Sequence, residues 1–169
     1  MAVYLLYRQH GVILFHDFDV RMGQGPQLHK RFEPIRTQDY EGSPIDLGRT
    51  RRPFQFVFFG ATKCKLCLKA FPALGRFAAQ NQSIAETVLL LRGEKETIPP
   101  FAPSLGQEVR IIPDRKGAIG RQLRIGTTPF AFLLDSNGVV RAKGAPTQDE
   151  EFAWFTDQMV DMLERHAAG

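Results

Sequence analysis

Two short, almost wholly apolar runs dominate the hydrophobic pattern of the chain. The first covers residues 54–59 and ends at Gly60, and the second covers residues 130–135. Runs of this length without polar alternation are typical of strands that are buried on both faces of a sheet. Shorter apolar stretches at 87–91 and 108–112 predict two more strands. The four runs together predict one central sheet.

Apolar residues at helical spacing predict two longer helices. One begins at or just after Cys64 and runs to about Ala79, with Pro72 inside it, where the missing N–H is expected to produce a kink. The other covers residues 148–165, and its aromatic residues fall on one face, which we interpret as core packing. A shorter helix is predicted at 116–123, although it contains two glycines.

Turn residues predict two hairpins. Residues 32–47 alternate around the turn at 40–44, and Ser-Asn-Gly at 136–138 leads the second apolar run into a strand at 139–142. A mixed lead-in at 16–34, punctuated by glycine and proline, precedes them. Because strands and helices alternate along the chain, we predict an α/β domain with a central mixed β-sheet flanked by helices.

Composition excludes several classes of protein. The chain has 169 residues, 43% hydrophobic and 24% charged, which suits one globular domain with a real core. Its net charge of +4 is too small a basic excess to indicate nucleic acid. The apolar start at 1–7 is too short for a membrane-spanning helix or an ordinary signal peptide. We interpret it either as the end of a membrane anchor region or as an edge strand or loose arm.

The only two cysteines form the motif Cys64-Lys65-Leu66-Cys67. Two cysteines are too few for a disulfide framework. A closed zinc site would need two more ligands, and none of the four histidines is paired at a ligand-like spacing, so no metal is expected. Two core cysteines placed three apart by chance would not explain the order of strand, glycine, cysteine and helix.

This order indicates redox chemistry. A cysteine at the start of a helix lies over unpaired backbone N–H groups at the positive end of the helix dipole, and Lys63 and Lys65 add positive charge nearby. Because the thiolate is the attacking species, we predict Cys64 as the nucleophile, with a pKa lowered from about 8.5. Cys67, one turn deeper, is predicted to be the buried resolving cysteine. Stabilising the thiolate also makes the disulfide of the pair a better oxidant.

Thr128-Pro129 stands immediately before the second apolar run. A proline at the first position of a strand is compatible with an ordinary loop end. Beside a C-x-x-C motif, however, it resembles the Thr-Pro peptide of the thioredoxin superfamily, in which a cis proline faces the active cysteines. The resemblance implies that the backbone before Pro129 binds an extended substrate.

The resemblance to the thioredoxin superfamily covers residues 32–163. It rests on the segments 40–47, 58–67 and 134–138, on Pro72 five residues after the second cysteine, and on Thr128-Pro129. Within the superfamily the chain is similar to the TlpA-type thiol-disulfide oxidoreductases and, through residues 8–12 and 141–144, to the methylamine utilisation proteins of the MauD family. These likenesses imply a thioredoxin-like fold at 32–169, behind an N-terminal extension at 1–31 that would be a remnant of a membrane anchor region.

The resemblance also implies a function. We expect an enzyme that exchanges disulfides with protein substrates, is served by an upstream redox partner, and uses no cofactor and no nucleic acid. The likeness to MauD implies disulfide formation or maturation of an exported enzyme such as methylamine dehydrogenase. It implies a periplasmic location, or a membrane-anchored one facing the periplasm, although the sequence alone leaves a cytoplasmic location open.

Two departures from thioredoxin bear on the mechanism. Lys65-Leu66 stands between the cysteines in place of Gly-Pro, and Phe58 stands where thioredoxins carry a buried Asp that assists proton transfer to and from the buried thiol. We expect a lysine or a water molecule to take over this task.

Two other functions stay open. Peroxiredoxin-like peroxidases share the fold, but they place Thr and Pro three and seven residues before the cysteine, where this chain has Thr62 two before and Val57 seven before. Sco-like copper chaperones use C-x-x-x-C and a distant histidine, a spacing one residue longer than the one found here.

Overall fold

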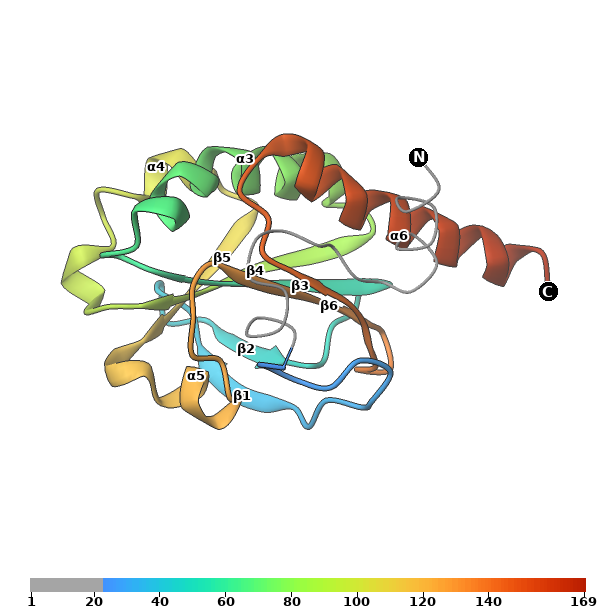
Figure 1. Cartoon of the computed structure of the whole chain (residues 1–169), viewed down its shortest axis with the longest axis horizontal. Coiled ribbons are helices and arrows are strands. Elements are labelled where there is room, and N and C mark those ends of the chain that lie inside the picture. Colours follow the sequence, from blue (N-terminus) through green and yellow to red (C-terminus); the bar gives the residue numbers. More distant parts are fainter. Residues whose placement is uncertain (1–22) are drawn as a thin grey trace.

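The structure, a computed structural model, describes residues 23–169. Five strands form its central sheet: β3 (Phe54–Ala61), β4 (Ala85–Arg92), β5 (Val109–Asp114), β6 (Phe130–Asp135) and β7 (Val140–Gly144). Their order across the sheet is β5-β4-β3-β6-β7 (Figure 1). β3, β4 and β5 run parallel, whereas β6 is antiparallel to both β3 and β7. The predicted mixed sheet is confirmed, with the two apolar runs as neighbouring interior strands.

Helices cover one face of the sheet, and a hairpin with a short helix covers the other. The elements are α3 (Lys65–Asn81), η1 (Lys95–Thr97), α4 (Ala102–Leu105), η2 (Arg115–Gly117), α5 (Ala118–Gln122), α6 (Asp149–Ala167), β1 (Ile35–Gln38) and β2 (Pro44–Leu47). α3, α4 and α6 lie on one side of the sheet, and β1, β2 and α5 lie on the other (Figure 1). Both long helices and both hairpins are therefore confirmed.

Alternate residues of the sheet face two separate cores. Phe56 of β3 points toward α3 and α6, and its ring centroid lies 4.5 Å from that of Phe77 and 4.9 Å from that of Phe155. The next residue, Val57, points into the second core, under the hairpin. Each of these fully buried side chains stabilises the fold by about 1.5–3 kcal/mol. The sheet is thus fixed to both long helices by aromatic contacts.

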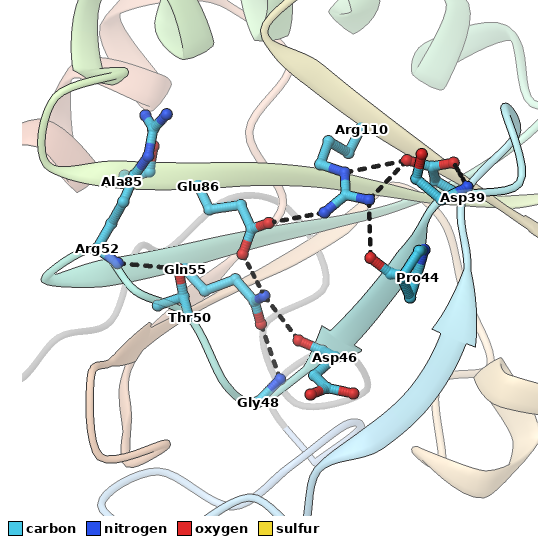
Figure 2. A network of polar contacts seen from close by, with 11 residues as sticks. Asp39, Pro44, Asp46, Gly48, Thr50, Arg52, Gln55, Ala85, Glu86 and Arg110 are labelled. Atoms are coloured by element: carbon cyan, nitrogen blue, oxygen red, sulfur yellow. Dashed lines mark hydrogen bonds and ion pairs between the residues drawn. The ribbon is translucent and has the colours of Figure 1, made fainter.

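A polar network joins the hairpin to the edge of the sheet (Figure 2). Arg110 of β5 binds Asp39 at 2.7 Å and Glu86 at 3.2 Å, and it also donates to the carbonyl oxygen of Pro44 at 3.1 Å. Burial opposes ionisation of Asp39, but hydrogen bonds from Arg110 and from the backbone N–H of Ser43 outweigh it, so its pKa lies below the usual value. The charged hydrogen bonds hold β1 and β2 against β4 and β5.

The same network continues to the buried amide of Gln55 in β3. Its Nε2 donates to Glu86 at 2.9 Å and to the carbonyl oxygen of Asp46 at 3.0 Å, and its Oε1 accepts the N–H of Gly48 at 2.8 Å. A polar side chain in an otherwise apolar strand is thereby fully hydrogen-bonded, as burial requires.

One predicted helix is wrong in extent. Residues 116–123 do not form a single helix, because Lys116 has φ 56° and Gly117 has φ 66°, both in the left-handed region. The regular helix begins at Ala118, where Asp114 accepts the N–H groups of Ile119 and Gly120, each at 2.9 Å. The left-handed pair turns the chain between β5 and α5.

The lead-in of the chain runs beside the edge strand β7. Three backbone hydrogen bonds join the two segments. The N–H of His29 donates to the carbonyl oxygen of Val140 at 2.8 Å, and the N–H of Val140 donates to that of Lys30 at 3.0 Å. The N–H of Phe32 donates to the carbonyl oxygen of Gly138 at 2.7 Å. The predicted domain boundary at residue 32 stays a prediction. The apolar start at 1–7 lies outside the described residues.

None of the helices within residues 23–169 combines the length and the apolar character that crossing a membrane requires.

Candidate active site

The two cysteines lie where β3 passes into α3. Cys64 has an extended backbone, with φ −90° and ψ 106°, and is the N-cap residue of the helix. Its N–H donates to the carbonyl oxygen of Ala61 at 3.0 Å, and its own carbonyl oxygen accepts the N–H of Leu68 at 3.1 Å. The chain therefore turns directly from the end of the strand into the first turn of the helix, as the pattern predicted.

Cys64 and Cys67 are joined by a disulfide, with their Cα atoms 5.2 Å apart. This separation lies in the normal range for disulfides. The N–H of Cys67 also donates to the sulfur of Cys64 at 3.2 Å. Cys64 is partly exposed, whereas Cys67 is fully buried. Of the two residues, only Cys64 therefore presents surface to a reaction partner.

The surroundings of Cys64 favour negative charge on its sulfur. The first turn of α3 has no acidic residue, and the backbone N–H groups at the start of the helix supply a positive partial charge. Lys63 and Lys65 flank the cysteine with exposed side chains. Leu66, between the two cysteines in the chain, is 48% exposed and adds an apolar side chain to this part of the surface.

The surroundings of Cys67 are apolar. It shares a core with Phe58, the residue at the position of the buried thioredoxin Asp, and Phe58 is fully buried. Within residues 23–169 the buried ionisable side chains are Asp114 and Lys143. Both belong to the opposite face of the sheet: Asp114 binds the start of α5, and the Lys143 ammonium lies 5.6 Å from the ring centroid of Phe130. Burial lowers the pKa of Lys143, but its position does not let it take over the task of the missing acid.

The peptide bond between Thr128 and Pro129 is cis, so this prediction is confirmed. The next residue, Phe130, pairs with Phe59 of β3 in the antiparallel ladder. The cis peptide therefore lies at the end of the sheet where β3 leads to Cys64. The structure thus brings the predicted cysteine pair and the predicted Thr-Pro peptide to the same end of the sheet.

Potential metal ligands are not gathered in the described part of the chain. Residues 23–169 contain no group of three or more His, Cys, Asp or Glu side chains that could hold a metal ion. His166 is exposed near the end of α6, where its Nδ1 lies 2.8 Å from the carbonyl oxygen of Met162. His10 and His16 lie outside the described residues.

One residue beside the site was missed in the sequence. Gln24, in the lead-in, hydrogen-bonds Gly126 and Thr127, which directly precede the Thr-Pro peptide. The lead-in reads as an irregular segment, and a single glutamine among glycines and prolines gives no signal of a partner more than a hundred residues away.

Comparison with known proteins places these features in context. No family model matches the chain. The methylamine utilization protein MauD of Paracoccus versutus is 30% identical over 146 residues, which cover 82% of this chain and 71% of that protein. The thiol-disulfide oxidoreductase ResA of Geobacillus thermodenitrificans is 28% identical over 105 residues, or 61% of this chain and 60% of that protein.

A solved structure agrees with this picture at the level of fold. A putative thiol:disulfide interchange protein DsbE from Chlorobium tepidum superposes with a TM-score of 0.69 at 18% identity, covering 80% of this chain and 96% of that one. The fold is thioredoxin-like, as predicted.

Proposed function

The chain belongs to the MauD family and is a thiol-disulfide oxidoreductase, and we propose that Cys64 and Cys67 are its catalytic pair, acting on the disulfides of an exported protein. The observation that carries the proposal is the contrast in exposure between two bonded cysteines. The partly exposed Cys64 is open to attack, and the fully buried Cys67 is reached only from within the protein.

In the reducing direction the steps balance as follows. The Cys64 thiolate attacks a substrate disulfide, forms a mixed disulfide, and releases one substrate thiolate, which takes up a proton. Cys67 then loses its proton and attacks the Cys64 sulfur, which closes the Cys64–Cys67 disulfide and releases the second substrate thiolate. The substrate gains two electrons from the pair. Of the two protons on its thiols, one balances the proton lost by Cys67 and the other comes from solvent, because Cys64 reacts as the thiolate. In the oxidising direction a substrate thiolate attacks Cys64 in the closed disulfide, and the same steps run in reverse.

The groups around Cys64 have distinct roles in this proposal. The helix N–H groups, with Lys63 and Lys65, stabilise the thiolate. The backbone at Thr128 and Pro129 offers hydrogen-bonding groups to an extended substrate segment. An upstream dithiol or disulfide protein restores the pair after each turnover.

The missing acid affects the rate of the second step. Phe58 and the other core side chains around Cys67 supply no group to accept the proton of the buried thiol, so a lysine or a water molecule from outside this core takes over the task in this proposal. Because the thiol must lose this proton before it attacks, the mixed disulfide at Cys64 is long-lived compared with that of a thioredoxin. A long-lived mixed disulfide suits the formation and rearrangement of disulfides better than rapid reduction.

The substrate in this proposal is the disulfide-rich small subunit of an exported dehydrogenase such as methylamine dehydrogenase. Support comes from the family, since the relatives are methylamine utilization proteins. The corresponding location is the periplasm, or a membrane-anchored position facing it, with residues 32–169 as the thioredoxin-like domain.

Trapping of the mixed disulfide tests the proposal. Cys67→Ser removes the resolving thiol, so the reduced variant should form a covalent adduct with the oxidised small subunit, and dithiothreitol should release it. The matched control, Cys64→Ser, keeps one cysteine but lacks the exposed one and should give no adduct. Turnover should be lost in Cys64→Ser. An adduct of equal yield with Cys64→Ser, or no adduct with either variant, would refute the assignment.

A further inference from the structure

We propose that Gln24 is a positioning residue for the substrate-binding loop at 126–128. Its side chain joins the lead-in of the chain to the two residues that precede the Thr128–Pro129 peptide. This inference rests on the function proposed above, because it concerns how the loop is made ready for a substrate.

The Gln24 amide makes three hydrogen bonds to two consecutive residues. Its Oε1 accepts the N–H of Gly126 at 2.9 Å and the N–H of Thr127 at 3.0 Å, and its Nε2 donates to Oγ1 of Thr127 at 2.8 Å. An amide oxygen has two lone pairs, and both are used here. The side chain is nearly buried, at 8% exposure, so its amide does not exchange these partners freely with water.

Gln24 is itself held in place by its backbone. Its carbonyl oxygen accepts a hydrogen bond from the Lys143 ammonium at 2.6 Å. The N–H of the following Gly25 donates to the carbonyl oxygen of Arg124 at 3.0 Å. Gly25 has φ 73°, and an added Cβ there would lie 2.6 Å from Cε1 of Phe130. A glycine is therefore needed at this position.

These contacts lie on both sides of the cis peptide. Gln24 fixes residues 126 and 127 before Pro129, and Gly25 packs on the ring of Phe130 after it. Gly126 and Thr127 are exposed and belong to no helix or strand. Without the amide this short stretch would have to be ordered each time a substrate binds, and that ordering would weaken binding. With the amide the loop is fixed before the substrate arrives.

A role in positioning has a different kinetic signature from a role in chemistry or in overall stability. An extended peptide needs the loop, whereas a small aromatic disulfide needs only access to Cys64. Loss of the Gln24 amide should therefore weaken exchange with the peptide and leave reaction with the small disulfide unchanged.

The experiment compares reduced wild type, Gln24→Ala and Gln24→Glu, with Gln27→Ala as the control in the exposed part of the same segment. The substrates are a short peptide with one intramolecular disulfide and 5,5′-dithiobis(2-nitrobenzoate). Gln24→Ala should raise KM for the peptide about tenfold, with kcat, the reduction potential and the rate with the small disulfide within twofold of wild type. Gln24→Glu keeps an oxygen acceptor for the two N–H groups and should recover part of the loss, and Gln27→Ala should match wild type.

Thr127→Val keeps Gln24 and removes only the hydroxyl that Nε2 binds, so it serves if Gln24→Ala does not fold. It should raise KM for the peptide about threefold. A Gln24→Ala or Thr127→Val variant that matches wild type on the peptide overturns the inference alone, as does an equal loss on both substrates. If wild type itself exchanges with neither disulfide, the proposed function fails and the inference fails with it.

Discussion

The backbone N–H of Cys67 donates to the sulfur of Cys64 at 3.2 Å, across the first turn of α3. The buried residue of the pair thus supplies a hydrogen bond to the exposed one. When the disulfide opens, the same N–H is in position to bind the Cys64 thiolate, and a hydrogen bond to an ionised acceptor is stronger than one to a neutral acceptor. The fold therefore supports an ionised sulfur on one cysteine while it withholds the other from solvent.

The positive charges beside Cys64 should raise its reactivity. A Lys63→Glu/Lys65→Glu double variant should be alkylated by iodoacetamide at pH 7 about two- to thirtyfold more slowly than wild type, since each exposed pair of opposite charges is worth roughly 0.2–1 kcal/mol and both lysine–thiolate pairs are lost. The rate is measured on the reduced protein by mass spectrometry. In about 1 M salt the difference should shrink, because exposed charges are screened.

Lys30→Glu serves as the control for this change, since Lys30 is exposed in the lead-in segment beside Val140. It should leave the alkylation rate unchanged. Equal rates for the double variant and wild type at low salt would show that the lysines have no electrostatic role.

The exposed side chain of Leu66 should contribute to binding of a protein substrate. Leu66→Ser should raise KM for the trapped small subunit about three- to tenfold, because burying the exposed half of an aliphatic side chain on binding is worth about 0.7–1.4 kcal/mol. Steady-state exchange kinetics measure the effect. The matched control is Val160→Ser on α6, which removes an apolar side chain of comparable exposure, 40% against 48%, away from the cysteines. A larger effect of Val160→Ser than of Leu66→Ser would contradict the prediction.

Asp39 should make the stability of the fold depend on pH. Burial alone would raise its pKa, but the hydrogen bonds from Arg110 and the backbone lower the pKa by more than burial raises it. The folded pKa therefore lies below the unfolded one. The stabilisation is then fully present above the unfolded value of about 3.9 and is lost as pH falls through the folded value. Asp39→Asn should lower the free energy of unfolding by about 1–3 kcal/mol at pH 7, as expected for a lost charged hydrogen bond.

Urea unfolding at pH 7 and at about pH 2.5 measures this difference, which should be smaller at pH 2.5, because that pH lies below the unfolded pKa and part of the stabilisation has been lost. Asp149→Asn is the control, because Asp149 pairs with Arg76 on the surface, where both side chains are more than half exposed. It should change stability little at either pH. A loss for Asp39→Asn that is equal at both pH values would exclude the ionised carboxylate as its cause.

Much of the fold follows from local pattern. The apolar runs that became β3 and β6 and the periodic segments that became α3 and α6 lie in the structure where they were predicted. The position of Cys64 at the helix start follows from the same pattern, since a glycine-terminated strand runs into it. These features depend on neighbours within a few residues, which a single sequence displays.

The missed features depend on distant partners. Gln24 binds a residue 103 positions away, and Arg110 binds Asp39 71 positions away, so no local pattern marks them. The helix predicted at 116–123 was too long for a local reason. Lys116 adopts a left-handed backbone conformation, which is uncommon for a lysine and is not predicted by its residue type. The sequence alone therefore does not predict side-chain pairing between distant segments or rare backbone conformations.

A redox titration of Cys64 and Cys67 tests most directly whether they act as one catalytic pair. Wild type is equilibrated in glutathione buffers, its free thiols are alkylated, and the products are counted by mass. We predict a single transition from no free thiols to two, with a midpoint between about −270 and −120 mV, the range from thioredoxin to a strong oxidant. Thiols that titrate one at a time, or a pair that stays fully oxidised or fully reduced throughout this range, would contradict the proposed role.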